Sequence, residues 1–559
     1  MTKDLHFMTV AGMASAIEKK SLSPVELTEA LLRRIDAIDP QLDAFVTVTA
    51  DHALAAARQA EADIAKGRYR GPLHGVPFGL KDIYDTAGIP TTGHSKICQE
   101  RVPAADATTT AKLKAAGGIL MGKLSTHEFA HGGPSFDLPW PPARNPWKTD
   151  CFTGGSSSGS GAAVAAGMLP AALGSDTGGS IRTPSGLCGI AGLKPTYGLV
   201  SRAGVIPNSF TFDTCGPMTW TVEDCAILLQ ALAGFDARDP ASADRPVPDY
   251  RAALSGDIRG LRIGAVRHFW EEDLPAKDET RRSMDAAIDV FRGLGAVVED
   301  VRLDPMQVYT DVKVVIAESE LFSIHSTALR KRPGDFGFDF RGRVLPACLI
   351  TSEDYVQAQK LRRRLVEAMA PIYAKYDVLI APSTYGPAPL LSDHRTASFW
   401  HKPKITTVFN VTAGPALSVC AGFSSGGLPL PMQIVGRPFD DATVLKVGHA
   451  YEQATDWRGR RPQLAAGAKP LPVKAPPMTA DASHVDAKTR RIVEVAVERA
   501  GLTLPEPIYA QLLEGAPHAL DVLDRLRGEF GFSDEPGNFW SFPATFQPRP
   551  GHAQKQAAE

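Results

Sequence analysis

The stretch that decides the fold runs from Cys151 to Gly198 and reads CFTGGSSSGSGAAVAAGMLPAALGSDTGGSIRTPSGLCGIAGLKPTYG. It contains 12 glycines and 7 serines but only three charged residues, which are Asp176, Arg182 and Lys194. Flexible Gly/Ser linkers lack apolar runs, whereas this stretch interleaves its glycines with AAVAA and GLCGIAGL. Such runs require burial, and buried glycines permit tight turns and close backbone approach. The stretch therefore predicts a buried core that carries an active site.

The composition of the whole chain is that of an ordinary globular protein. Its 559 residues are 44% hydrophobic and 22% charged, with a formal net charge of −2. No basic surplus indicates nucleic acid or an anionic membrane as a partner. The seven cysteines are odd in number, scattered and without a C-x-x-C spacing, which favours reduced thiols in the cytoplasm. The first residues contain no apolar run of the signal-peptide type.

The order of the predicted elements indicates an α/β protein. A strand over 261–266, a helix over 280–294 and a strand over 297–301 form a βαβ pattern. Short apolar runs at 118–123 and 376–382 predict further buried strands. Residues 304–376 are expected to be mainly helical.

The chain divides into three predicted parts. Residues 1–462 form the catalytic domain, and residues 463–485 form an Ala/Pro-rich linker without periodicity. Residues 486–559 form a small helical appendage, which is too small to be stable alone. We expect it to dock on the main body or on a second subunit, so that a homodimer through the appendage is one predicted arrangement.

The segment Asp176-Thr177-Gly178-Gly179-Ser180 is the first candidate for chemistry. Successive backbone N–H groups in such a turn can bind an anion or the oxyanion of a tetrahedral intermediate. Ser180 lies at the end of the turn and is placed to attack a carbonyl held there. The alternative is an ordinary glycine turn with a solvated serine. The second glycine-serine cluster, residues 154–159, favours the catalytic interpretation.

A serine nucleophile requires a base, and the core stretch contains no histidine. A neutral lysine can act as the base when burial lowers its pKa from about 10.4. Lys81, Lys123 and Lys194 all lie at the ends of apolar, glycine-spaced runs. Residue types alone do not choose among the three, and the alternative for each is an exposed lysine at a strand end.

The string His127-Glu128-Phe129-Ala130-His131 fits the H-E-x-x-H pattern of zinc sites. The two histidines, at i and i+4, could share one face of a helix. The glycines and proline at 132–134 would end any such helix at once, and no third ligand follows. We therefore predict no metal site and no cofactor.

Taken together, these pieces resemble the amidase signature family of serine amidohydrolases. The matching segments are GPLHGVPFGLKDIYDTAGIPTT at 71–92, GGSSSGSGAAVAAG at 154–167, GSDTGGSIRTPSGLCGIAGLKPTYG at 174–198, FDTCGPMTWTVEDCAILL at 212–229 and GLPLPMQIVGRPFDDATVLKVGHAYE at 427–452. The resemblance implies an amidase-signature fold, a mixed central β-sheet covered by helices on both faces. It covers roughly residues 8–460 and leaves out the appendage, which is distantly similar to the small helical partner subunits of some of these amidases.

The resemblance also implies a Ser–cis-Ser–Lys triad. Ser180 matches the nucleophile, Ser156 the bridging serine, and Lys81 the lysine base. The N–H groups of Thr177, Gly178, Gly179 and Ser180 are implied to form the oxyanion hole. Asp176 and Arg182 are expected to be structural and paired.

The predicted activity is hydrolysis of a carboxylic amide (aryl, alkyl or anilide) to an acid plus ammonia or an amine, through an acyl-enzyme. The alternatives are the amidase subunit of a tRNA-dependent glutamine amidotransferase and a non-catalytic scaffold. The expected partner is a small-molecule amide, with no nucleic acid and no membrane. Candidate acyl-pocket residues near the motifs are Phe152, Thr153, Ile206, Phe210 and Phe212. Most of the pocket is expected to come from residues 304–400, where no motif identifies the amide.

Overall fold

The computed structural model describes residues 5–396 and 398–527, and within them eleven strands form one mixed sheet. The strand order is β1-β3-β2-β4-β6-β5-β10-β11-β9-β7-β8. The strands are β1 Phe45–Val48, β2 Pro77–Lys81, β3 Ile119–Leu124, β4 Ala171–Asp176, β5 Ala191–Lys194, β6 Thr214–Thr219, β7 Arg262–Ala265, β8 Val297–Asp300, β9 Val378–Pro382, β10 Ala416–Phe423 and β11 Pro429–Gly436. The strands predicted at 118–123, 261–266, 297–301 and 376–382 are all present, as β3, β7, β8 and β9.

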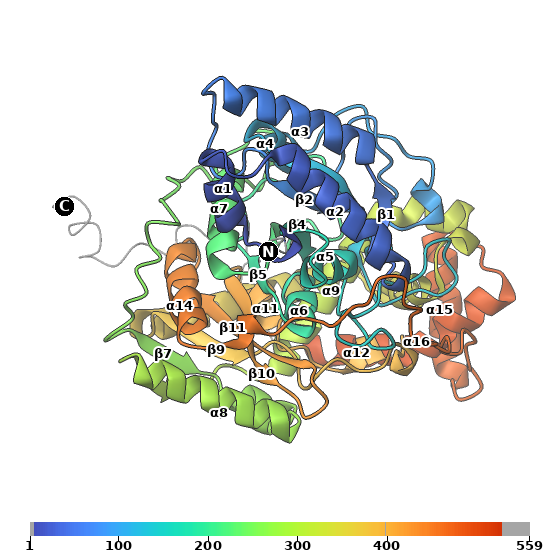
Figure 1. Ribbon diagram of the computed structural model, residues 1–559. Coiled ribbons are helices and arrows are strands. Elements are labelled where there is room, and N and C mark those ends of the chain that lie inside the picture. The colour runs from blue at the N-terminus through green and yellow to red at the C-terminus, as the bar shows by residue number, and fades with distance from the viewer. Residues whose placement is uncertain (1–4, 397, 528–559) are drawn as a thin grey trace.

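Helices cover both faces of this sheet (Figure 1). The helices are α1 Val10–Glu18, α2 Pro24–Ile38, α3 Ala50–Ala65, α4 Thr108–Ala115, α5 Ser158–Ala165, α6 Arg182–Cys188, α7 Val222–Leu232, α8 Asp278–Gly293, α9 Met306–Lys331, α10 Phe338–Val344, α11 Ser352–Lys375, α12 Ser398–His401, α13 Val408–Val411, α14 Asp441–Gln453, α15 Ala487–Ala500 and α16 Glu506–Leu526. The predicted βαβ unit is confirmed, because β7 and β8 pair in parallel and α8 connects them.

The start of α2 shows how local sequence sets an element. Ser23 is the N-cap, and its side chain accepts hydrogen bonds from the N–H groups of Val25 and Glu26. Pro24 occupies the first turn, where its missing N–H costs nothing. Apolar residues at helical spacing, among them Leu31, are buried on one face.

Two parallel central strands create the edge on which the candidate site lies. β2 lies between β3 and β4 and runs parallel to both, and every residue of β2 and β4 is buried. Burial on both faces explains why these strands lack polar/apolar alternation. Because they are parallel, the carboxyl end of β2, Lys81, and that of β4, Asp176, reach the same edge of the sheet.

The appendage docks on the catalytic body. α15 and α16 lie together at one side of the molecule, with α16 packed against α9, α10 and α12 (Figure 1). Their apolar residues, including Val493 and Leu512, belong to the same continuous core as the main sheet. Residues 463–485 contain no helix or strand. The division into three parts and the homodimer stay predictions.

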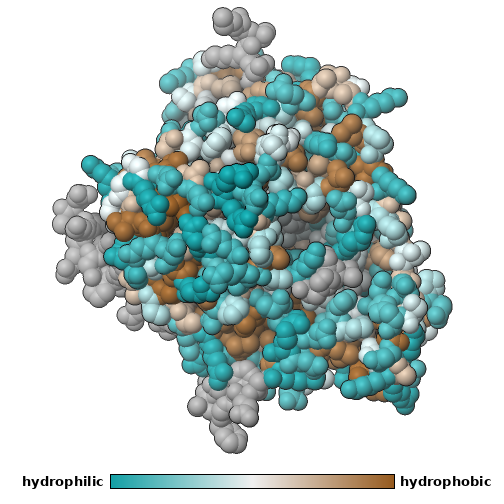
Figure 2. All heavy atoms as spheres, turned by 90° about the horizontal axis from the view of Figure 1, so that it is seen from below, coloured by the Kyte–Doolittle hydropathy of each residue, from teal (hydrophilic) through white to brown (hydrophobic). Residues whose placement is uncertain are grey.

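Hydrophilic side chains cover most of the face shown in Figure 2, and the apolar side chains form small, separate groups on it. Among the described residues, no helix combines the length and hydrophobicity needed to cross a membrane.

Candidate active site

Lys81 ends β2 in a fully buried position beside two serine hydroxyls. Its Nζ lies 2.7 Å from Ser156 Oγ and 2.9 Å from Ser175 Oγ. Burial lowers the pKa of Lys81 to about 7, although the more distant carboxylates of Asp213 and Asp176 oppose that shift. A substantial fraction of this amine is therefore neutral at neutral pH and able to accept a proton.

The predicted bridging serine and nucleophile, Ser156 and Ser180, both come from the glycine-rich stretch. Ser156 precedes α5, and the peptide bond between Gly155 and Ser156 is cis. The N–H of Ser157 donates to the carbonyl of Ser180 at 3.2 Å, so the backbone next to Ser156 is hydrogen-bonded to Ser180 itself. The structure thus brings Lys81, Ser156 and Ser180 into one site.

The turn from Thr177 to Ser180 follows the carboxyl end of β4. Gly179 has a φ of +122°, and a Cβ there would lie 2.2 Å from Thr406 Oγ1, so only glycine fits. Its N–H donates to Asp176 Oδ1 at 2.8 Å. That N–H is therefore engaged within the protein, and an oxyanion would rely on the other predicted donors, Thr177, Gly178 and Ser180.

Asp176 and Arg182 form a buried pair that holds this turn. Both side chains are fully buried, and Arg182 donates to the two carboxylate oxygens at 2.9 and 3.0 Å. Asn410 and Gln433 complete the network, accepting from the guanidinium at 2.6 and 2.8 Å respectively. Arg182 and Asn410 hold the pKa of Asp176 well below its ordinary value, against the effect of burial. The expected structural pairing is confirmed.

The other two candidate lysines have different partners. Lys123 lies 3.1 Å from Asp82 Oδ1 in a fully buried ion pair, and Lys194 donates to the carbonyl of Pro195 at 3.0 Å. All three lysines are buried, so the alternative of an exposed lysine at a strand end is wrong. Each buried amine has hydrogen-bond partners, which offset part of the cost of removing it from water.

A cavity of about 310 Å³ opens onto the turn that carries Ser180. Three cationic side chains line it, Lys313 from α9, Arg343 from α10 and Lys404, and we call them the cation cluster. They surround one aromatic ring, that of Phe399, at 5.5, 4.7 and 4.8 Å from its centroid. The described residues that line the cavity include no Asp or Glu.

The acids near the cation cluster lie behind it. Arg343 pairs with Asp339 at 2.8 Å, and Lys313 lies 3.7 Å from Glu318. No ion pair joins Lys404 to an acid within the part of the chain that the structure describes. Lys404 is accessible from the cavity, but the surrounding protein and its two cationic neighbours lower its pKa to about 7. This arrangement favours a negatively charged group in the cavity.

The predicted pocket residues lie in different places. Phe152 lines the cavity beside Ser180, whereas Thr153 is buried and its hydroxyl donates to the carbonyl of Gly154. Phe212 is buried in the core, with the guanidinium of Arg362 over its ring at 4.9 Å. Its side chain therefore does not reach the cavity.

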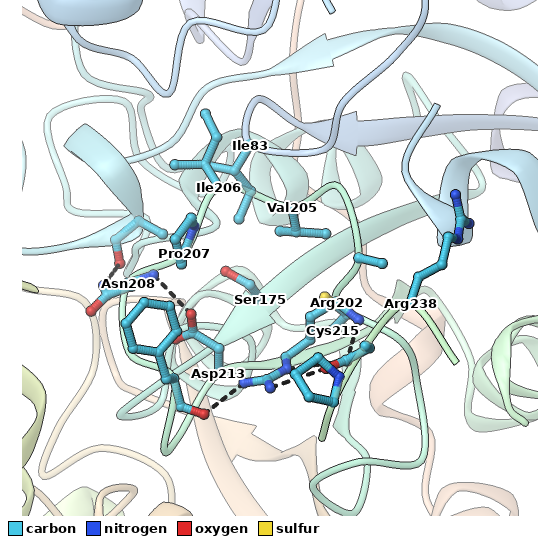
Figure 3. A pocket seen from close by; sticks show the side chains of 15 residues that line it. Ile83, Ser175, Arg202, Val205, Ile206, Pro207, Asn208, Asp213, Cys215 and Arg238 are labelled. Carbon is cyan, nitrogen blue, oxygen red and sulfur yellow. Dashed lines mark hydrogen bonds and ion pairs between the residues drawn. The ribbon is translucent and has the colours of Figure 1, made fainter. Parts of the chain in front are cut away.

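Ile206 and Phe210 line a second cavity of about 260 Å³, which Ser175 also lines (Figure 3). Figure 3 shows the apolar Ile206 on one side of this cavity and Asp213 and Arg202 on the opposite side. Proximity to the motifs in sequence did not separate the two cavities, which are adjacent and share Ala130 and Asn208 in their linings.

The H-E-x-x-H string does not form a helix. Only Glu128–Ala130 makes a 3₁₀ turn, and Phe129 and Ala130 have positive φ angles. The expectation that His127 and His131 could share a helix face is wrong, because this backbone cannot continue as an α-helix. Both histidines line the cavity, and burial lowers the pKa of each.

The cation cluster is the part of the site that sequence reasoning missed. Lys313 and Arg343 come from the segment expected to supply the pocket, and Lys404 lies just beyond it. Each is a single basic residue without a motif, in a chain whose charge is nearly balanced. The only indication in the sequence was that residues 304–400, the segment expected to supply the pocket, lack family motifs.

Comparisons with known proteins agree with this geometry. The family model described as Amidase matches residues 26–445. A glutamyl-tRNA(Gln) amidotransferase subunit of Chloroflexus aggregans is 40% identical over 488 residues, covering 83% of this chain and 99% of that protein. The structure of the peptide amidase from Stenotrophomonas maltophilia is 30% identical with a TM-score of 0.71, covering 81% of this chain and 98% of that one.

Another similar structure belongs to a vestigial protein complex described as revealing the evolutionary origins of an s-triazine catabolic enzyme. It is 31% identical, with a TM-score of 0.75, and covers 82% of this chain and 99% of that one.

Replacing Arg182 by methionine (Arg182→Met) should lower the free energy of unfolding by about 3–5 kcal/mol, because it leaves the buried Asp176 carboxylate without its cation. Urea titration measures this change. The control Arg251→Met removes an ion pair with Glu223 in which the arginine is 53% exposed, and it should have a much smaller effect. Equal effects of the two substitutions would contradict the structural role of the buried pair.

Proposed function

Since this chain belongs to the amidase family, we propose that it hydrolyses a carboxylic amide with Ser180 as nucleophile, Ser156 as proton relay and Lys81 as base. The observation that carries the proposal is the 2.7 Å contact between Lys81 Nζ and Ser156 Oγ in a buried site. Burial that lowers the pKa of Lys81 to about 7 supplies a base at working pH.

The proposed reaction begins with neutral Lys81. It takes the proton of Ser156, which takes the proton of Ser180, and Ser180 Oγ forms a bond to the amide carbonyl carbon. The N–H groups of Thr177, Gly178 and Ser180 stabilise the oxyanion. The relay then returns the proton to the amide nitrogen, the C–N bond breaks, and ammonia or an amine leaves. Water attacks the resulting acyl-enzyme through the same relay and releases the carboxylic acid.

The substitution Ser180→Ala should lower kcat/KM by at least about 10⁴-fold, because no acyl-enzyme can form. It should also abolish covalent labelling by a phosphonofluoridate, which mass spectrometry of the intact protein detects. The control Ser160→Ala removes another buried hydroxyl, which donates only to the carbonyl of Leu173, and it should keep full labelling. Undiminished labelling of Ser180→Ala would reject the nucleophile.

The pH profile should report the protonation of Lys81. The base must be neutral, so kcat/KM for an uncharged amide should be constant above about pH 8 and should fall tenfold per pH unit well below 7. Lys81→Arg should be inactive across this range, because a guanidinium stays protonated. A profile that is flat from about pH 5.5 to 8, or an active Lys81→Arg enzyme, would indicate another base.

The cavity supports a more specific substrate class, a small amide that carries a carboxylate. The cation cluster can bind a carboxylate by donating charge-assisted hydrogen bonds to it. Phe152, Tyr385 and Phe399 supply apolar surface for the rest of the molecule. This lining argues against the fully apolar aryl or alkyl amide that the sequence suggested.

A second candidate is the glutaminase subunit of a tRNA-dependent amidotransferase. It is favoured by the name of the relative that is 40% identical to this chain. Glutamine carries a carboxylate that suits the cation cluster, but it also carries an ammonium group, and the described lining offers no acid to pair with it. In this second function the protein would act together with partner proteins and a tRNA, which differs from the prediction of no nucleic-acid partner.

Comparison of succinamate with uncharged succinamide and with glutamine should separate these candidates. We expect the wild type to prefer succinamate, and Lys404→Met to raise its KM by about 10- to 100-fold through loss of a charge-assisted hydrogen bond. The control Lys402→Met removes an exposed lysine two residues away and should leave the KM for succinamate unchanged. Equal use of succinamate and succinamide would reject the carboxylate requirement, and preference for glutamine would support the second candidate.

A further inference from the structure

The elements that carry the cation cluster are the elements on which α16 packs. Lys313 belongs to α9, Arg343 belongs to α10, and Phe399, the ring at the centre of the cluster, belongs to α12. α16 contacts all three helices, and Figure 1 shows α16 beside α12 at one side of the molecule. The matched family segment ends at residue 445, so α16 lies outside it.

Gln511 of α16 holds α10. This side chain is 3% exposed, its Nε2 donates to the carbonyl of Phe338 at 2.6 Å, and its Oε1 accepts from Arg341 Nε at 3.4 Å. A Cβ on Gly342 would lie 2.8 Å from Gln511 Nε2, so the two helices approach closely at the residue before Arg343. The position of Arg343 is thus set from behind by α16.

Arg525 of α16 holds α9 in the same way. It donates to both carboxylate oxygens of Asp311 at 2.7 and 2.8 Å, and the side chain of Asp311 is only 4% exposed. Residues two apart on a helix point about 200° apart, so Asp311 faces α16 while Lys313 faces the cavity. A bidentate pair of this kind restricts both rotation and translation of α9.

α12 is connected to the same unit. Trp400 Nε1 donates to the carbonyl of Gly342 at 3.4 Å, which links the helix of Phe399 to that of Arg343. Glu514 of α16 and His394 both line a further cavity of about 250 Å³, and His394 also lines the cavity beside Ser180. His394 thus connects a cavity at the appendage with the proposed substrate site.

We propose that α16 is a built-in brace that holds Lys313 and Arg343 around Phe399, and that it thereby sets the affinity of the site for the anionic part of the substrate. Gln511 and Arg525 act as positioning residues in this arrangement. The proposal rests on the carboxylate-bearing substrate class given above. It assigns the appendage a role in specificity, besides the stability that its apolar contacts provide.

The test uses the full chain and glutarate, a dicarboxylate that cannot be hydrolysed. Isothermal titration calorimetry should show binding to the wild type and about three- to tenfold weaker binding to Gln511→Ala and to Arg525→Ala, as expected for loss of one positioning interaction. KM for succinamate should rise by a similar factor. The kcat/KM for succinamide should stay at the wild-type value, which a general loss of folding would not allow.

The matched control is Arg527→Ala. Arg527 follows α16 and pairs with Asp354 of α11, a helix that contributes nothing to the described cavity lining, so glutarate affinity should not change. Arg525 is 41% exposed, so Arg525→Ala should fold even if Gln511→Ala does not. Arg525→Lys, which keeps a cation near Asp311, should recover part of the affinity.

The outcomes separate this proposal from the one on which it rests. Wild-type binding of glutarate with unchanged affinity in Arg525→Ala would overturn the brace and leave the substrate class standing. Absence of glutarate binding to the wild type, together with equal use of succinamate and succinamide, would overturn both. An equal loss of affinity in the Arg527→Ala control would also overturn the brace, because the effect would then not depend on the helices that carry the cation cluster.

Discussion

The buried ion pair between Asp176 and Arg182 is the interaction on which the rest of the structure depends. Asp176 ends β4, and its carboxylate accepts from the N–H groups of Gly179 and Ile181 as well as from Arg182. Removing water from two charges is costly, and the cost is offset only when every oxygen and N–H has a partner. Asn410 and Gln433 supply the remaining contacts from distant segments, so the pair ties the nucleophile turn to the second half of the sheet.

Burial lowers the pKa of lysines in both parts of the site, but these lysines have different partners. Lys81 lies in a desolvated position next to two serine hydroxyls, where loss of its proton removes the cost of the buried charge. In the cation cluster, Lys313 and Arg343 keep acids behind them, and a carboxylate ligand would restore the balance for Lys404. Lys81 thus has only hydroxyl partners within contact, whereas Lys313 has a carboxylate at 3.7 Å, although burial acts on both in the same direction.

The appendage lies outside the segment that matches the family, but it packs as part of the same structure. α15 and α16 follow a stretch without helix or strand, and yet their apolar residues join the main core. Leu512 and Leu523 are fully buried, and polar contacts from the same helix reach α9 and α10. Apolar burial accounts for docking, and the directed contacts of Gln511 and Arg525 account for a defined orientation.

The sequence by itself determined the sheet-forming runs and the glycine turn before Ser180, and the family motifs singled out Lys81 rather than Lys123 or Lys194 as the proposed base. Such features are local: the cap at Ser23, for example, depends on a few neighbouring residues. Only the tertiary structure decided which side chains surround the cavity beside Ser180. Lys313, Arg343 and Lys404 lie on different segments, and no motif in their own neighbourhoods marks them. They become a site because α9, α10 and α12 are packed together, and long-range packing of that kind leaves no pattern within any one stretch.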